Sequence, residues 1–185
     1  MSSNMTSIDS SHFRKALGHY ASGITVISSL VEGEPIGFTC QSFYSVSMNP
    51  PLVSFSVMAG SASYPKIRQA GRFAVNILSD KQVRISNQFA QRGADKWQGV
   101  EWWESPLGNP VIANSVQWLD CEIYAGHAAG DHVIVIGEVK ALGPEYSAIR
   151  QPLVYFKGQY HIIADQVTNS GFAARRAAAD GSVER

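Results

Sequence analysis

The stretch GFTCQSFYSVSMNPPLVSFSV, residues 37–57, decides the fold expected for this chain. Apolar and polar side chains alternate along much of it, which is typical of half-buried β-strands. A strand pair that only fills a core would not carry so many hydroxyls. A surface pair would not carry so many large apolar side chains. The pattern therefore predicts strands that turn one face to a core and present small hydrogen-bonding groups on the other.

The flanking sequence predicts more strands, mostly joined by hairpins, with a few short helices between them. Because the strands do not alternate regularly with long helices, the order favours a mainly β fold over a doubly wound sheet. We expect a small antiparallel barrel with helices at its ends. Extended segments are expected within residues 24–43, 49–58, 72–78, 115–143 and 152–163, helices over 9–20, 61–71 and 79–91, and an irregular loop over 92–110.

Length and composition suit one globular domain. The chain has 185 residues, and we expect a single domain over residues 1–163 with a flexible or weakly helical tail over 164–185. Only 16% of the residues are charged, well below the usual quarter or so, which favours burial of surface against another subunit. The formal net charge is zero, so no basic surface for nucleic acid is expected. No apolar run approaches the length of about 18 residues that marks a membrane helix.

The cysteines and the first residues bear on the compartment. Residues 1–13 show neither the charged nor the apolar region of a signal peptide. Cys40 and Cys121 lie far apart and form no C-x-x-C motif, so two buried thiols in a reducing cytoplasm are favoured over a disulfide.

The familiar catalytic motifs are absent from the sequence. It contains no dinucleotide-binding glycine fingerprint, phosphate loop, zinc helix or hydrolase nucleophile elbow. His127, Asp131 and His132 form a metal-like cluster, although a polar hairpin tip is the better interpretation of it. Cys40 is better explained as a small buried side chain than as a nucleophile. These absences favour chemistry carried by a bound cofactor that the protein orients.

Three stretches together resemble a known family: residues 37–57, GRFAVNIL at 71–78 and AGDHVIVIGEV at 129–139. In this order and spacing the chain is similar to the flavin reductase-like family, the short-chain NAD(P)H:flavin oxidoreductases, from about Phe13 to about Ile162. The resemblance implies an FMN-binding split β-barrel and a homodimer with its flavin site near the subunit interface. It also implies FMN or FAD and NADH as cofactors, with NADPH as the alternative. The implied partner is a flavin-dependent monooxygenase that receives the reduced flavin.

The resemblance also implies a set of site residues. The strand that starts at Gly37 would follow the flavin ring, with Phe38 and Cys40 facing away from it. A helix N-terminus opened by serines would hold the flavin phosphate, and His132 would contact the carboxamide or pyrophosphate of NADH, with Tyr160 walling that pocket. The full set is Gly37, Phe38, Thr39, Cys40, Gln41, Ser42, Ser56, Val57, Ser61, Ser63, Gln88, Phe89, Lys96, His132 and Tyr160, with Lys96 as the cation nearest a phosphate.

Each assignment has a simpler alternative. Ser42 and Thr39 would also serve as hydroxyls bonded to nearby backbone, Phe89 as core, and Lys96 as a solvated surface lysine. Gln41 stands where many relatives carry Asn, so the preference between FMN and FAD stays open. The alternative function is a flavin- or haem-binding barrel without turnover. A pyridoxamine-phosphate oxidase is disfavoured because few arginines fall in the matched strands.

Overall fold

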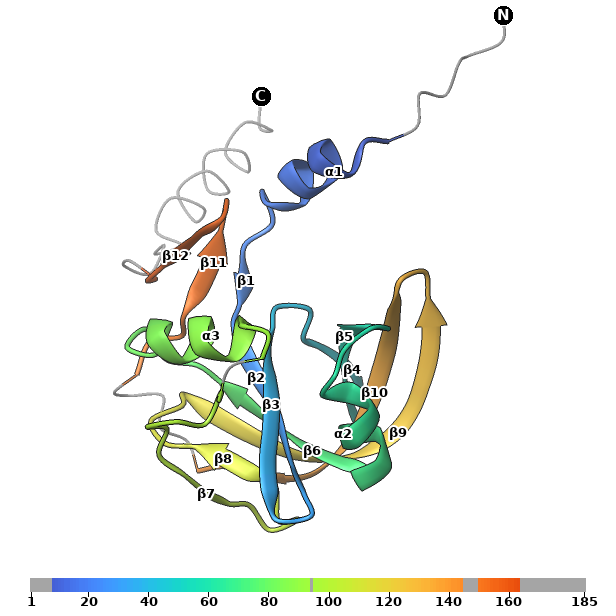
Figure 1. Ribbon diagram of the computed structural model, residues 1–185, viewed down its shortest axis with the longest axis vertical. Helices are drawn as coiled ribbons and strands as arrows, with labels where there is room; N and C mark the ends of the chain where they lie inside the picture. The colour runs from blue at the N-terminus through green and yellow to red at the C-terminus, as the bar shows by residue number, and fades with distance from the viewer. Residues whose placement is uncertain (1–7, 94, 145–149, 164–185) are drawn as a thin grey trace, which may run out of the picture.

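The computed structural model describes residues 8–93, 95–144 and 150–163. Its body is a seven-stranded antiparallel sheet in the order β3-β2-β6-β9-β10-β5-β4, which curls into an open barrel (Figure 1). The predicted mainly β fold is confirmed, and the expected tail over 164–185 lies outside the described residues. The strands of this sheet are β2 (Thr25–Val31), β3 (Glu34–Cys40), β4 (Tyr44–Met48), β5 (Pro51–Met58), β6 (Arg72–Ile77), β9 (Gln117–Ala129) and β10 (His132–Leu142).

Smaller elements flank the barrel. A three-stranded sheet joins the start of the described chain to its end, and a two-stranded ladder lies within the loop that was expected to be irregular. None of the described helices is long and apolar enough to cross a membrane. These elements are β1 (Ser22–Gly23), β7 (Trp102–Glu104), β8 (Pro110–Ile112), β11 (Val154–Phe156), β12 (Gln159–His161), α1 (Ser10–Leu17), α2 (Tyr64–Ala70) and α3 (Val83–Ala90).

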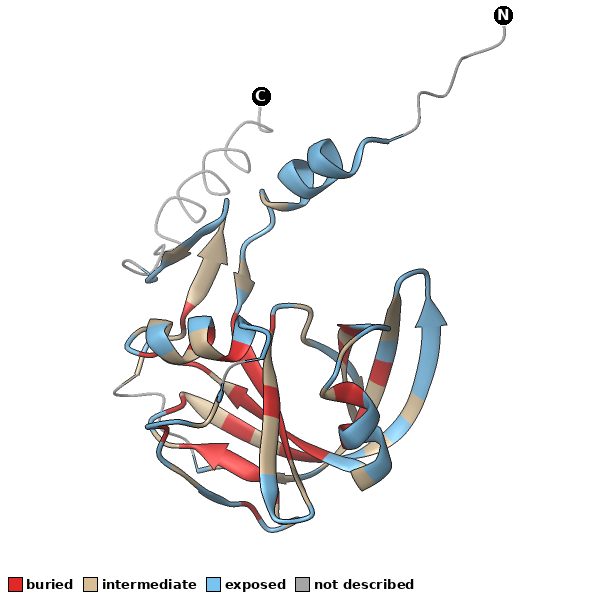
Figure 2. Ribbon diagram, viewed as in Figure 1, coloured by how far each residue is buried: buried red, intermediate tan, exposed pale blue. Residues whose placement is uncertain are grey.

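The barrel interior explains the alternation seen in the sequence. Along β5, Val53, Phe55 and Val57 are buried while the serines between them are only partly covered. The rings of Phe55 and Phe73 meet edge to face with centroids 5.2 Å apart, an arrangement that aromatic pairs prefer. Buried residues accordingly recur along the strands of the barrel, whereas α1 is exposed (Figure 2). The half-buried character predicted for residues 51–58 is confirmed.

A second apolar cluster fixes α3 and the loop that follows it. Phe89 of α3 is fully buried beside Leu78 and Ile112, and its ring meets Trp97 edge to face at 4.9 Å. Trp97 in turn contacts Trp102 at 5.8 Å. This aromatic row ties Trp97 to α3 and the barrel, and the neighbouring Lys96 reaches the carbonyl of Gly37 in β3.

Candidate functional site

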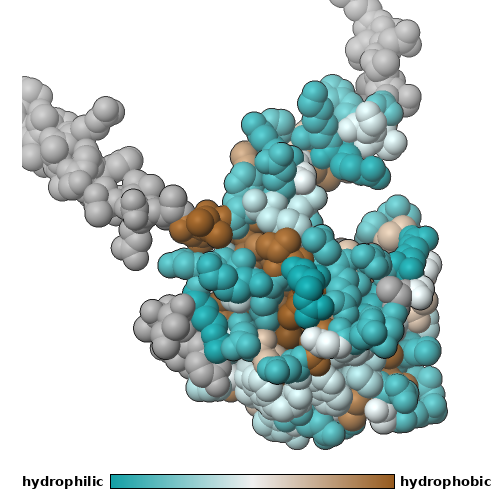
Figure 3. All heavy atoms as spheres, turned by 60° about the vertical axis from the view of Figure 1, so that its left-hand side comes forward, coloured by the Kyte–Doolittle hydropathy of each residue, from teal (hydrophilic) through white to brown (hydrophobic). Residues whose placement is uncertain are grey.

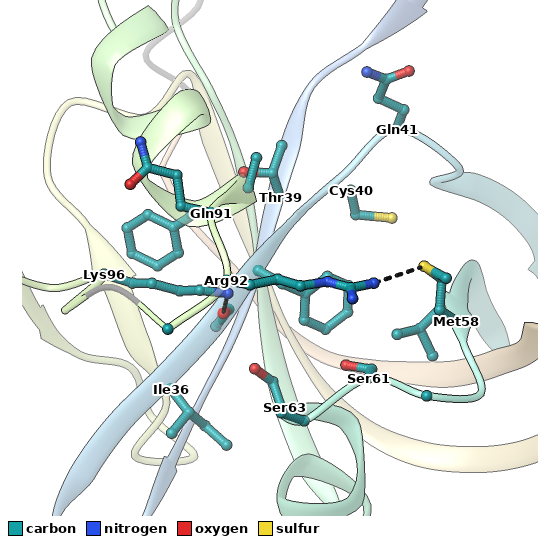
Figure 4. A pocket seen from close by; sticks show the side chains of 18 of the residues that line it. Ile36, Thr39, Cys40, Gln41, Met58, Ser61, Ser63, Gln91, Arg92 and Lys96 are labelled. Atoms are coloured by element: carbon teal, nitrogen blue, oxygen red, sulfur yellow. Dashed lines mark hydrogen bonds between the residues drawn. The ribbon is translucent and has the colours of Figure 1, made fainter.

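A cleft of about 940 Å³ opens beside the free edge of the barrel (Figure 4). That volume lies near the upper end of the ~300–1,000 Å³ usual for small-molecule sites. Three segments far apart in the sequence form it: the strand β3, the turn between β5 and α2, and the loop after α3. Its lining residues fall within 35–42, 56–63 and 89–97, together with His132.

The edge of β3 supplies main-chain groups to the cleft. β3 is a terminal strand of the sheet and, within the described part of the chain, pairs only with β2. The carbonyl of Gly37 accepts a hydrogen bond from Lys96 Nζ at 3.1 Å, so it points away from β2. Because the N–H and C=O of one residue project to the same side and alternate along an antiparallel strand, those of Thr39 also project toward the free edge. A planar ligand with a polar edge could therefore form hydrogen bonds with the main chain of β3 here, without the help of any side chain.

Ser42 closes the gap between β3 and β5. Its Oγ donates to the carbonyl of Ser56 at 3.0 Å and accepts from the Ser56 N–H at 2.9 Å, so it replaces a missing strand-to-strand contact. Cys40 Sγ lies 3.3 Å from the same Oγ, and burial raises the pKa of the Cys40 thiol. Ser42 therefore lines the cleft as predicted but uses its hydroxyl inside the protein. Cys40 is a buried, protonated thiol, as the sequence favoured.

The turn before α2 presents hydroxyls that the fold does not use up. Ser61 Oγ accepts a long hydrogen bond of 3.3 Å from the Tyr64 N–H, which leaves its proton free to donate. Ser63 is the residue before α2, yet its side chain makes no capping hydrogen bond. Both serines line the cleft and lie on the wall opposite Lys96 (Figure 4). Their anion-binding role stays a prediction.

Two cations overhang the cleft from the loop after α3. Lys96 is half-buried, and burial lowers its pKa below the ordinary value. Arg92 reaches across to the opposite wall, where its Nη2 lies 3.9 Å from Met58 Sδ. The neighbouring carboxylate of Asp95 accepts from the Trp97 N–H at 3.1 Å. Arg92 was missing from the sequence-based set, because nothing in the sequence near it signals that the loop folds back over β3.

The depressed pKa of Lys96 gives a pH dependence. A lysine carries its charge below its pKa, so lowering the pKa makes this charge disappear earlier as the pH rises. We expect the affinity for a phosphorylated ligand to fall at alkaline pH, and to fall earlier than titration of an exposed lysine would allow. A Lys96→Arg variant keeps its charge throughout, and its affinity should stay level over the same range. Equilibrium titrations across alkaline pH test this, and identical profiles for the two proteins would contradict it.

His132 lies at the far end of the cleft with one ring nitrogen already engaged. Its Nδ1 is 2.6 Å from Asp131 Oδ1, and this hydrogen bond lowers the pKa of Asp131. Nε2 is therefore the nitrogen left for a ligand. His132 stands opposite Met58 in the β10–β5 pairing, which puts it at the same end of the cleft as the guanidinium of Arg92.

Gln88 and Tyr160 lie outside the cleft lining, although both were expected in the site. Gln88 Nε2 donates to the carbonyls of Lys96 at 3.0 Å and Gln98 at 2.9 Å, so Gln88 supports the loop. The Tyr160 hydroxyl donates to Asn87 Oδ1 at 2.8 Å. Tyr160 does not wall the cleft, because β12 packs on α3 rather than on the β10 end. The remaining predicted residues line the cleft together: Gly37, Phe38, Thr39, Cys40, Gln41, Ser42, Ser56, Val57, Ser61, Ser63, Phe89, Lys96 and His132.

Thr39 and Phe89 line the cleft and also help to hold β3 and α3 together. Thr39 Oγ1 donates to the Ser86 carbonyl at 2.6 Å, which ties β3 to α3. Phe89 is fully buried, so it contributes part of the inner wall and part of the core. Gly37 has no room for a side chain, because a Cβ there would lie 2.9 Å from the Ile27 carbonyl oxygen and 3.0 Å from the Phe89 ring. Close packing of β3 against α3 thus shapes this wall.

Comparison with known proteins gives a consistent result. The model of the "Flavin reductase like domain" matches residues 17–164. The reductase subunit HsaB of a flavin-dependent monooxygenase from Mycobacterium tuberculosis is 39% identical over 161 residues, covering 87% of this chain and 86% of that one. A flavin reductase of Pseudomonas putida is 40% identical over 156 residues, covering 84% and 91% of the two chains. The structure of the NADH:FAD oxidoreductase SgcE6 of Streptomyces globisporus with NAD and FAD fragments superposes with a TM-score of 0.80 at 30% identity, covering 86% of this chain and 95% of that one.

Proposed function

The chain belongs to the flavin reductase like domain family, and on that premise we propose that it transfers a hydride from NADH to FMN or FAD and releases the reduced flavin to a separate monooxygenase. The observation that carries the proposal is the cleft of about 940 Å³ along the free edge of β3. The relatives support it, since HsaB is a reductase subunit of a flavin-dependent monooxygenase and SgcE6 is an NADH:FAD oxidoreductase.

The residues of the cleft fit a flavin nucleotide. Apolar walls for a planar ring come from Ile36, Val57 and Met58, and the free main-chain groups of β3 match the polar rim of such a ring. Hydroxyls that the fold leaves free, at Ser61 and Ser63, suit a phosphate. A bound flavin supplies the two-electron acceptor. Apart from the two cations over the cleft, the groups that would contact the flavin are small and uncharged. Such contacts suit a reduced flavin that must dissociate.

The contribution of the protein is to position and shield the reactants. Hydride transfer between two stacked rings requires no protein acid or base, so near-attack placement provides most of the rate enhancement. His132 would hold the dihydronicotinamide through Nε2, because Asp131 fixes Nδ1 at 2.6 Å. The main-chain donors of β3 would favour the extra negative charge of the reduced ring.

A spectrophotometric assay tests the proposal directly. Purified protein is mixed with NADH or NADPH and with FMN, FAD or riboflavin in excess, and the absorbance of the reduced nicotinamide is followed. We expect catalytic oxidation of NADH with FMN or FAD. Flavin binding without oxidation in any combination would reject the reductase in favour of a carrier protein.

Replacing His132 by Ala should separate nicotinamide binding from flavin binding. Loss of one ligand hydrogen bond with a charged or strongly polar group is expected to raise KM for NADH about tenfold, while the flavin Kd stays within about twofold. The matched control is His127→Ala, because His127 is exposed on the same hairpin and does not line the cleft. Equal effects of the two substitutions would contradict the role of His132.

We infer a homodimer from apolar surface that the described chain leaves uncovered. Phe13 and Leu17 of α1 are exposed, although their helical spacing suggested a packed face. Burial raises the pKa of Tyr44, and the neighbouring Tyr20 raises it further. Tyr20 follows α1 and Tyr44 begins β4, so the segment after α1 lies beside β4. Met48, at the other end of β4, is 87% exposed. Apolar residues also reach the surface at the end of the β11–β12 hairpin, where Ile162 is 67% exposed (Figure 3). A solution mass of 20.1 kDa by light scattering, rather than twice that value, would contradict the dimer.

We also infer a single domain in the cytoplasm. The family match runs through the barrel and the small sheet without a break. Both cysteines are free and buried, which suits a reducing compartment. Two separately stable fragments after limited proteolysis would contradict the single domain, and recovery of the protein outside the cytosolic fraction would contradict the compartment.

A further inference from the structure

Arg92 is a cation that spans the cleft without a carboxylate partner among the residues that the structure describes. It leaves the chain two residues after the end of α3, and its side chain runs over the cleft toward Met58 on the opposite wall (Figure 4). Its hydrogen bond in the described part of the chain is the contact of 3.9 Å from Nη2 to Met58 Sδ. A thioether is a weak acceptor and a guanidinium has five donors. Most of the hydrogen-bonding capacity of Arg92 is therefore unused.

The side chains across and beside the cleft from Arg92 include hydroxyls that can donate hydrogen bonds and a second cation. Ser61 and Ser63 present hydroxyls from the other wall, and Lys96 adds a second cation from the same loop. Asp95, the acid that lines the same cleft, has Oδ1 engaged by the Trp97 N–H at 3.1 Å. Of the four ion pairs formed by the described residues, none includes Arg92. Arg92 is therefore placed to bind an anionic group of a ligand that enters the cleft.

We propose that Arg92 selects phosphorylated substrates: a phosphoryl oxygen replaces the sulfur of Met58 as the acceptor for the guanidinium. The planar fork of arginine matches two phosphoryl oxygens at once, whereas the sulfur accepts one weak hydrogen bond. The contact with Met58 holds the side chain over the cleft and is easily exchanged. The inference rests on the proposed function, because the phosphoryl group belongs either to the flavin nucleotide or to the nicotinamide dinucleotide.

The test compares FMN with riboflavin, which differ by the phosphate alone. In wild type and Arg92→Gln, Kd values for both flavins are measured by quenching of flavin fluorescence. We expect the substitution to raise the Kd of FMN about tenfold, as for loss of a charge-assisted hydrogen bond, and to leave that of riboflavin within about twofold. Arg92→Lys keeps the charge but not the fork, so its FMN affinity should be intermediate. Arg68→Gln on α2 is the matched control, since Arg68 is exposed and outside the cleft lining.

A second arm distinguishes the two sources of phosphate. With riboflavin as acceptor, KM for NADH is measured in wild type and Arg92→Gln. A rise of about tenfold in this KM, with both flavin Kd values unchanged, would support phosphate selection on the nicotinamide side. Equal weakening of FMN and riboflavin, or no change in any of these values, would overturn the role of Arg92. Failure of the wild type to bind any flavin would instead overturn the proposed function.

Discussion

A Ser61→Trp variant should lose at least about a hundredfold in affinity for FMN and FAD, equivalent to about 3 kcal/mol, while its fold stays intact. Ser61 lines the cleft on the wall opposite Lys96, and Figure 4 shows its side chain directed toward the space that Arg92 crosses. An indole there would fill the volume that a planar ring requires. Turnover of NADH should fall with the affinity, and both quantities can be measured in the same titrations.

Two companion variants make this result specific. Ser61→Ala removes the hydroxyl without adding bulk, so it should weaken binding only about as much as the loss of one hydrogen bond, a few-fold to tenfold. Gln69→Trp places the same indole on the exposed side of α2, away from the cleft, and should bind flavin normally. Wild-type affinity in Ser61→Trp, with a melting curve like that of the parent, would show that flavin binds elsewhere.

The largest stability effect is expected for Gly137→Ala. A Cβ on Gly137 would lie 2.3 Å from Cζ of Phe73 and 2.8 Å from its Cε1, and Phe73 is fully buried in the barrel. Neither the ring nor the strand can move without disturbing the packing around Phe55. Overpacking of this kind costs about 3 kcal/mol, at the upper end of the usual range. Thermal unfolding should show a Tm lower by roughly 6–12 °C for a chain of this size.

Replacing Phe73 by a smaller residue tests whether the clash with its ring causes the loss of stability. In Gly137→Ala with Phe73→Leu, the atoms that clash are gone, so the double variant should be more stable than the sum of the two single effects predicts. Gly23→Ala is the control, since a Cβ there meets nothing within 4 Å. Additive losses in the double variant would show that the glycine is needed for another reason.

The fold and most of the cleft lining were predictable from the sequence. Residues 51–58 alternate in burial as their sequence alternates in polarity, because the two faces of a strand are set by local geometry alone. The three matching stretches then indicated the family. Thirteen of the site residues that the family pattern implied line one cleft. Tyr160 and Gln88 lie outside the cleft lining, because their positions depend on how β12 and the loop after α3 pack, which no local pattern encodes.

Alternation of apolar and polar residues, turn signals and a family pattern thus determined most strands of the barrel, their order along the chain and the segment that borders the cleft, but not the β7–β8 ladder. The partner that each side chain finds was decided by the tertiary structure. Ser42 bonds to Ser56 across the barrel gap, Gln88 holds the loop of Lys96, and Arg92 extends over the cleft. The physical reason is that hydrogen bonds and charges act over a few ångströms in space, and these residues, eight to thirty-four positions apart, become neighbours only when the chain folds.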